Sequence, residues 1–183
     1  MAPTFDGSRE VVIRRWVSIP DRERLTPEID AVFFESSGTK TFAGKGERAA
    51  FRSRWLGKYL ATEPQFAYVA LADDGTLAGY LVGSLLEPIG FEAFANAAWE
   101  FPAHLHVNLA PQFRNRGIGG RPIAAFATDA LAAGAPGMHV VTSADSRNVT
   151  FYTRNGFAEI ARTSIDGREL LLLGRKLGVA ESP

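Results

Sequence analysis

The fold of this chain is decided by the stretch Arg114-Asn115-Arg116-Gly117-Ile118-Gly119-Gly120-Arg121. It follows an apolar, strand-like run at residues 104–109 and leads into a helical pattern at residues 119–133. Glycines at the start of a helix leave backbone N–H groups uncovered, and the first turn adds unpaired donors that attract an anion. The arginines supply planar groups suited to phosphate. The stretch therefore predicts a loop that binds a polyanion, and a flexible loop with solvated arginines is the simpler alternative.

Two familiar glycine patterns do not fit this loop. No lysine-serine or lysine-threonine pair follows the glycines, which excludes the phosphate loop of nucleoside triphosphatases. No repeated strand-helix-strand unit surrounds the stretch, which argues against a dinucleotide-binding fold. The anion expected here is bound in some other structural setting.

The bulk composition is that of a globular protein. Of 183 residues, 46% are hydrophobic and 22% charged, and twenty basic residues balance twenty acidic ones. This balance gives no reason to expect nucleic acid or a membrane as partner. The absence of cysteine excludes disulfides, thiolate-bound zinc and a cysteine nucleophile, and we expect no metal. No signal-peptide pattern opens the chain, and no apolar run is long enough to span a bilayer, so we expect a cytoplasmic protein.

Hydrophobic periodicity predicts the order of the elements. Strands are expected at residues 10–14, 66–72, 77–86, 104–109, 138–143, 157–163 and 168–173, and helices at 20–35, 47–60, 119–133 and 146–155. Residues 87–102 are expected to form a loop or one short helix. Asp-Gly pairs at two strand connections, such as Asp74-Gly75, are strong hairpin signals.

This interleaving of hairpins and helical crossovers predicts an α/β (α+β) fold. We expect a single mixed, mostly antiparallel sheet of about seven strands with helices on both faces. No repeat or linker divides the chain, so residues 1–183 are expected to form one domain with a flexible tail at 178–183.

Two motifs together resemble the GNAT N-acetyltransferase superfamily. The run Leu109-Ala110-Pro111-Gln112-Phe113-Arg114-Asn115-Arg116-Gly117-Ile118-Gly119 looks like its acyl-CoA signature, Arg/Gln-x-x-Gly-x-Gly/Ala. The run Phe151-Tyr152-Thr153-Arg154-Asn155-Gly156-Phe157 resembles its second signature. The resemblance is clear over about the last 80 residues. It implies a GNAT-like fold and acetyl-CoA as co-substrate.

The resemblance also implies where the co-substrate binds. The acetyl-pantetheine arm would lie along Val107, Asn108 and Leu109. The family often has an asparagine seven residues before the tyrosine, where this chain has Asp145. Asp145 or Asn148 could contact the co-substrate, and we favour Asn148 because a carboxylate near phosphates is repelled. Backbone N–H groups of the glycine loop would hold the pyrophosphate, and these belong to Arg114, Asn115, Arg116, Gly117, Ile118, Gly119 and Gly120.

Proton transfer is expected from tyrosine and histidine. Tyr152 matches the family tyrosine that protonates the leaving thiolate, although it could instead only pack. The segment holding His104 and His106 resembles the paired histidines of arylalkylamine N-acetyltransferases, and residues two apart on a strand share a face. The pair is therefore a candidate general base. The alternatives are that Glu87 or Glu100 takes this role, or that both histidines belong to the core.

The acceptor wall is expected from Phe33, Phe34 and Glu35 and from the loop at residues 39–42. Three further aromatic residues, which could equally belong to the core, are Phe91, Phe94 and Trp99. No cysteine and no Gly-x-Ser-x-Gly elbow is present to carry a covalent intermediate.

The resulting hypothesis is an N-acetyltransferase in which a primary amine of a small molecule or peptide attacks acetyl-CoA directly. A non-catalytic acyl-CoA sensor is the alternative, and a phosphate-binding enzyme of another family is a third. The sequence leaves the acceptor and the oligomeric state open, a homodimer included.

Overall fold

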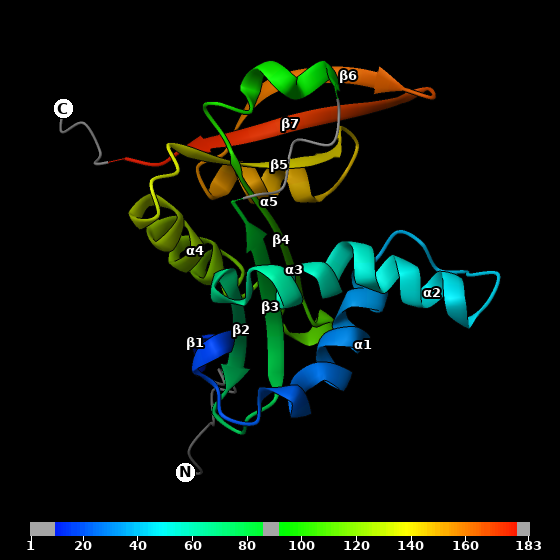
Figure 1. Cartoon of the computed structure of the whole chain (residues 1–183), viewed down its shortest axis with the longest axis vertical. Helices are drawn as coiled ribbons and strands as arrows, with labels where there is room; N and C mark the ends of the chain where they lie inside the picture. The colour runs from blue at the N-terminus through cyan, green and yellow to red at the C-terminus, as the bar shows by residue number, and fades with distance from the viewer. Residues whose placement is uncertain (1–9, 86–91, 179–183) are drawn as a thin grey trace, which may run out of the picture.

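The computed structural model describes residues 10–85 and 92–178, and its centre is one seven-stranded sheet (Figure 1). The strand order is β1-β2-β3-β4-β5-β7-β6, and only the β4–β5 pair is parallel. The strands are β1 Val11–Arg15, β2 Ala67–Ala72, β3 Leu77–Ser84, β4 Ala103–Leu109, β5 Gly137–Ser143, β6 Ala158–Ile165 and β7 Arg168–Lys176. The expected mixed, mostly antiparallel sheet is confirmed.

Helices cover both faces of the sheet, as the alternation of side chains along the strands requires. The α-helices are α1 Thr26–Ser36, α2 Lys45–Arg52, α3 Lys58–Thr62, α4 Gly120–Ala132 and α5 Asn148–Arg154. One buried cluster joins α1 and α3 to Tyr80 and Val82 of β3, and a second joins α4 and α5 to Leu81. The α4 face fits closely, because a Cβ at Gly83 would run into the ring of Phe126. The histidines of β4 thus lie on the α1/α3 face.

The helix boundaries differ from expectation in two places, each with a local cause. The expected helix at 20–35 begins as a 3-10 turn, Arg22–Leu25, and becomes α-helical only at Thr26. Pro27 then occupies the first helical turn, where its missing N–H costs nothing. The expected helix at 47–60 is interrupted by a π-helical turn, Ser53–Gly57, which separates α2 from α3.

The other expected helices and strands begin and end within a few residues of their observed limits. Further 3-10 turns are Trp16–Ser18, Pro64–Phe66, Glu92–Ala97 and Pro111–Phe113. Of the expected tail, residues 179–183 lie outside the described residues. Within residues 10–85 and 92–178, no helix is long and apolar enough to cross a membrane.

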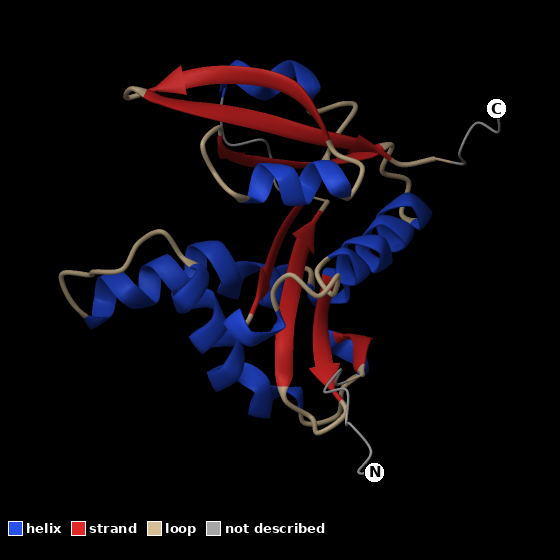
Figure 2. Ribbon diagram, turned by 180° about the vertical axis from the view of Figure 1, so that it is seen from behind, coloured by secondary structure: helices blue, strands red, loops and turns tan. Residues whose placement is uncertain are grey.

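The sheet divides where β4 and β5 separate. These strands share only two register pairs, Ala103↔Met138 and His104↔His139. Beyond them, β5, β7 and β6 run crosswise to β1–β4, as the two opposite views in Figures 1 and 2 show. Between the described strands, a gap therefore opens beside residues 105–109 of β4.

Candidate active site

Beyond their two register pairs, the facing edges of β4 and β5 do not pair with each other. On its other side, β4 continues to pair with β3, through Leu81↔Val107 and Tyr80↔Asn108. Val107, Asn108 and Leu109 are all half-buried. An unpaired strand edge presents backbone donors and acceptors that an extended amide-containing group can pair with. The predicted pantetheine-lining residues thus lie along an edge suited to that role.

The glycine loop follows directly at the open end of the gap. Residues 114–117 are exposed, and Gly117 has a φ of 72° with no atom within 4 Å of a Cβ placed on it. Gly119 is buried instead, since its Cβ would stand 2.9 Å from the ring of Phe151 in α5. α4 then begins at Gly120 with no acidic residue in its first turn. Open backbone and a bare helix N-terminus fit a phosphate-bearing group.

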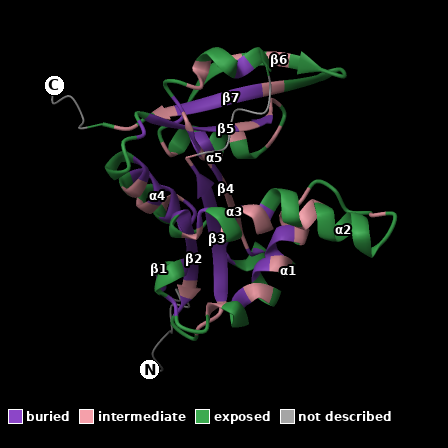
Figure 3. Ribbon diagram, viewed as in Figure 1, coloured by how far each residue is buried: buried purple, intermediate pink, exposed green. Residues whose placement is uncertain are grey.

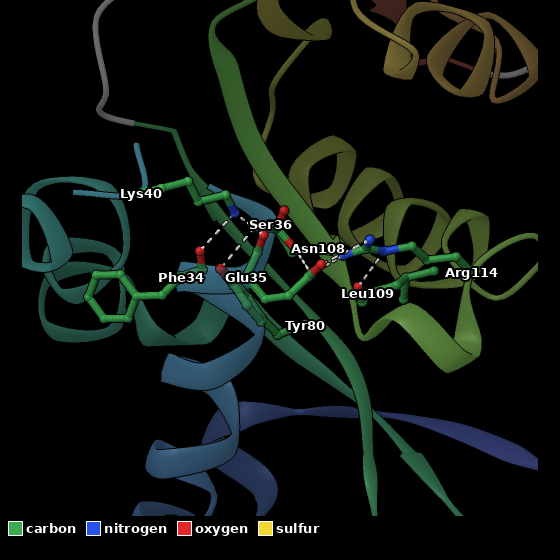
Figure 4. A network of polar contacts seen from close by, with 8 residues as sticks. All are labelled: Phe34, Glu35, Ser36, Lys40, Tyr80, Asn108, Leu109 and Arg114. Carbon is green, nitrogen blue, oxygen red and sulfur yellow. Dashed lines mark hydrogen bonds and ion pairs between the residues drawn. The ribbon is translucent and has the colours of Figure 1, made fainter. Parts of the chain in front are cut away.

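Arg114 turns its side chain away from this loop toward the acceptor side (Figure 4). Its guanidinium donates to the carboxylate of Glu35, to the Ser36 hydroxyl at 3.1 Å and to the backbone oxygen of Leu109 at 2.9 Å. Lys40 donates to the carbonyls of Phe34 and Glu35. The C-terminal end of α1, where the acceptor wall was expected, is therefore fastened to the end of β4, and Glu35 is already paired with a cation.

All three histidines of the chain meet at the closed end of the gap. The Nε2 atoms of His104 and His106 are 3.0 Å apart, and the rings of His104 and His139 have centroids 4.8 Å apart. The Nδ1 atom of His139 donates to the backbone oxygen of Phe101 at 2.6 Å, which leaves its Nε2 unprotonated when the ring is neutral. The buried Nδ1 of His104 makes no hydrogen bond within the described structure.

The imidazoles of His104 and His106 are held neutral by their surroundings. Burial, followed by the charge of Lys58 and the proximity of His139, lowers the pKa of His106 to about 4. Burial, together with His106, His139 and Lys58, lowers the pKa of His104 well below 6.5. At neutral pH both rings are therefore free bases that can accept a proton.

The π-helical turn brings two aromatic residues onto His106. The hydroxyl of Tyr59 lies 3.2 Å from His106 Nε2, and the Trp55 and His106 rings meet edge to face with centroids 5.7 Å apart. Trp55 keeps 37% of its surface exposed, whereas Tyr59 is buried. His106 is thus the imidazole nearest to a partly open aromatic wall.

Tyr152 lies in α5 and is 6% exposed. Its ring packs on Phe157 with centroids 5.3 Å apart, and its hydroxyl makes no hydrogen bond to any residue that the structure describes. Burial raises the pKa of this phenol, so the group keeps its proton at neutral pH. Asn148, at the start of α5, is exposed and accepts from the Thr142 hydroxyl at 2.8 Å.

The remaining candidates are spread over core and surface. Phe33 is buried in the α1 core, and Phe34 contacts both Phe33 and Phe42. Phe94 is 1% exposed and Trp99 is 87% exposed. Glu100 pairs with Lys176 at the surface, whereas Glu87 and Phe91 lie outside the described residues.

Sequence reasoning missed three residues of this site: His139, Tyr59 and Trp55. The chain has only three histidines, so a third one on a buried strand was a signal available in the sequence. Its contact with His104 depends on the parallel register of β4 and β5, which no local pattern encodes.

Comparison with known proteins places this arrangement among acetyltransferases. A sequence model of the acetyltransferase (GNAT) family matches residues 31–157, more than half of the chain. The crystal structure of SsHAT superposes with a TM-score of 0.70 at 21% identity, covering 92% of this chain and 99% of that one.

Two further solved structures share the fold. An N-acetyltransferase from Staphylococcus aureus Mu50 has a TM-score of 0.65 at 15% identity, covering 92% of this chain and 99% of that one. A chain of the NatC complex bound to Gag peptide and CoA has a TM-score of 0.65 at 13% identity, with the same two coverages. At these identities the superpositions establish the fold alone.

Proposed function

Because the chain belongs to the GNAT acetyltransferase family, and is thereby an acetyl-CoA-dependent acyltransferase, we propose that it acetylates a primary amine by direct attack. The acceptor is a small molecule or a peptide. The observation that carries the proposal is the gap between β4 and β5, with neutral imidazoles at its closed end and the glycine loop at its open end.

The co-substrate would lie in this gap. Val107, Asn108 and Leu109 would offer their unpaired strand edge to the pantetheine amides, and the backbone from Arg114 to Gly120 would bind the pyrophosphate. When bound, the thioester supplies an acetyl group whose carbonyl carbon the amine can attack.

His106 takes the proton that the amine must lose. An aliphatic ammonium with a pKa near that of lysine, about 10.4, is mostly protonated at pH 7 and cannot attack. The free amine attacks, and the nitrogen becomes acidic as the carbon–nitrogen bond forms, so the neutral His106 can then accept its proton. His106 lies 3.0 Å from His104, so this proton can pass to the second ring. His139 holds a fixed tautomer against His104 through its bond to Phe101.

Tyr152 supplies a proton to the leaving thiolate. As the carbon–nitrogen bond forms and the carbon–sulfur bond breaks, negative charge develops on sulfur. A phenol that keeps its proton and makes no hydrogen bond within the described protein is available to donate to that sulfur.

The proposal is tested by calorimetry and thiol release. Acetyl-CoA is titrated against CoA and ATP, and thiol release is then followed over a panel of primary amines. Selective acetyl-CoA binding with amine-dependent release supports the proposal. Binding without release on every amine favours an acyl-CoA sensor, and no binding at all overturns the assignment of the gap.

Substitution of Tyr152 tests the donor role. Tyr152→Phe is expected to lower kcat by about a hundredfold or more while leaving the acetyl-CoA Kd unchanged. Tyr68→Phe is the matched control, because it also removes a buried hydroxyl, one bonded to Asp129 on α4. Equal loss of affinity and turnover in Tyr152→Phe would count against proton donation.

A further inference from the structure

A strongly basic segment adjoins the acceptor side of a protein that is otherwise neutral. Residues 40–58 hold six lysines and arginines and one acidic residue, whereas the whole chain has a net charge of zero. α2, within this segment, has no buried residue and projects from the body of the molecule (Figures 1 and 3). Charge concentrated on an exposed arm raises the local concentration of oppositely charged ligands.

Two of these cations contact the aromatic rings that pack on His106. The ring of Trp55 meets His106, and the guanidinium of Arg54 lies 5.0 Å from the Trp55 ring centroid. The ring of Tyr59 has its centroid 5.4 Å from that of His106, and Lys58 Nζ lies 5.0 Å from the Tyr59 centroid. Each aromatic ring that contacts His106 is therefore also contacted by a cationic side chain.

The positive charge of Lys58 acts on the titration of the two histidines. It is among the causes that lower the pKa values of both His104 and His106. The same positive charge disfavours a protonated amine beside His106, so it promotes the free base that the reaction needs. An acceptor whose only charge is its ammonium would be repelled here.

Three acidic side chains in the described part of this wall are already engaged. Glu35 is bound by Arg114, and Asp30 by Arg52 at 2.7 Å. The buried carboxylate of Glu63 accepts from the Ser84 hydroxyl and from the backbone N–H of Leu85. Arg54, by contrast, makes no ion pair with any residue in the described part of the chain. Its planar guanidinium can bind a carboxylate with two hydrogen bonds.

We propose that the acceptor is a primary amine that also carries a carboxylate, which Arg54 binds, aided by the positive charge that Lys58 places near His106. The proposal rests on the acetyltransferase function proposed above and names its substrate class. A free amino acid and the N-terminus of an acidic peptide are two sources of this chemistry.

The test compares acceptors that differ only in the carboxylate. Thiol release is measured for tyrosine against tyramine, phenylalanine against phenethylamine, and peptides that begin with Asp against those that begin with Asn. We expect kcat/KM to favour the carboxylate member of a pair by about tenfold or more, chiefly through KM, and the preference to shrink as salt is added. Preference among free amino acids or among acidic peptides identifies the source.

Variants locate the charge that is responsible. Arg54→Gln and Lys58→Met are each expected to reduce the carboxylate preference about tenfold, whereas Lys45→Gln, which removes an equal charge from exposed α2, should leave the preference intact. Equal use of both members of every pair by the native protein overturns the substrate class alone. An absence of thiol release with every amine overturns the proposed function, and this inference with it. Circular dichroism and melting curves establish that each variant is folded.

Discussion

The two ends of the gap between β4 and β5 differ in burial and in the polar groups that they hold. At the closed end, the His104 ring contacts those of His106 and His139, and His106 also contacts the buried Tyr59. Their surroundings keep His104 and His106 neutral. At the open end, residues 114–117 are exposed, and α4 begins with no acidic residue in its first turn. Proton transfer benefits from fixed tautomers and short hydrogen-bonding distances, whereas binding of a polyanion benefits from accessible donors and unscreened dipoles. One separation of strands thus provides both environments at a short distance along β4.

The largest expected effect belongs to the closed end. His106→Gln keeps a polar side chain but removes the group that accepts the proton, so kcat should fall by about 10² to 10⁴. Affinity for acetyl-CoA, measured by calorimetry, should stay within a factor of about two, because the glycine loop is untouched. A variant that loses cofactor affinity as strongly as turnover would show that the two ends are not separate.

The same histidine should make stability depend on pH. His106 has a pKa of about 4 when folded and about 6.5 when unfolded, so between these values only the unfolded chain binds the proton. Stability should therefore decrease as the pH falls from 6.5, by about 3 kcal/mol at pH 4 from this group alone.

Denaturant unfolding of the native protein and of His106→Gln at pH 7.5 and pH 4.5 isolates that contribution. The native protein should lose more stability between the two conditions than the variant does. An identical loss in both proteins would mean that His106 titrates normally in the folded state.

A change at the open end should produce the reverse pattern. Gly117→Ala forces an alanine into a left-handed conformation and should distort the loop, weakening acetyl-CoA binding about tenfold while kcat at saturation is retained. Gly75→Ala is a matched control, since Gly75 has a φ of 82° and an equally open Cβ position in the turn between β2 and β3. If both variants weaken binding alike, the effect reflects general destabilisation rather than the loop.

The smallest expected effect concerns His139, where two substitutions distinguish the roles of its two ring nitrogens. His139→Asn preserves a donor near the position of Nδ1, which bonds Phe101, whereas His139→Gln places its amide nearer the position of Nε2. If the bond to Phe101 orients His104, Asn should retain activity within about threefold and Gln should lose about tenfold. The pH–rate profile is the readout, because a purely structural defect would lower the rate at all pH values without moving the profile.

The glycine loop and the sheet could be predicted from the sequence because both are encoded locally. The run from Arg114 to Arg121 lies within one connection, and all seven strands end within three residues of their expected limits, in part because Asp-Gly turns delimit them. The order of hairpins and crossovers then leaves few arrangements for a mixed sheet. Family membership and fold class are both confirmed.

The closed end could be predicted only in part. His104 and His106 share a strand and therefore a face, but the approach of His139 requires the parallel register of a strand that lies more than thirty residues away. The position of Tyr59 depends on a π-helical turn, and the pairing of Arg114 with Glu35 joins segments 79 residues apart. Such contacts arise from tertiary packing, so local sequence patterns do not predict them.

The π-helical turn at Ser53–Gly57 has a consequence for how the acceptor wall can change over evolutionary time. A π-turn accommodates one additional residue in a helix, and each residue rotates the following side chains by about 100°. Loss of a single residue within this turn would swing Tyr59 and Lys58 away from His106 and present a different set of side chains. Homologues that differ by one residue at this point would then act on different acceptors while sharing an unchanged glycine loop.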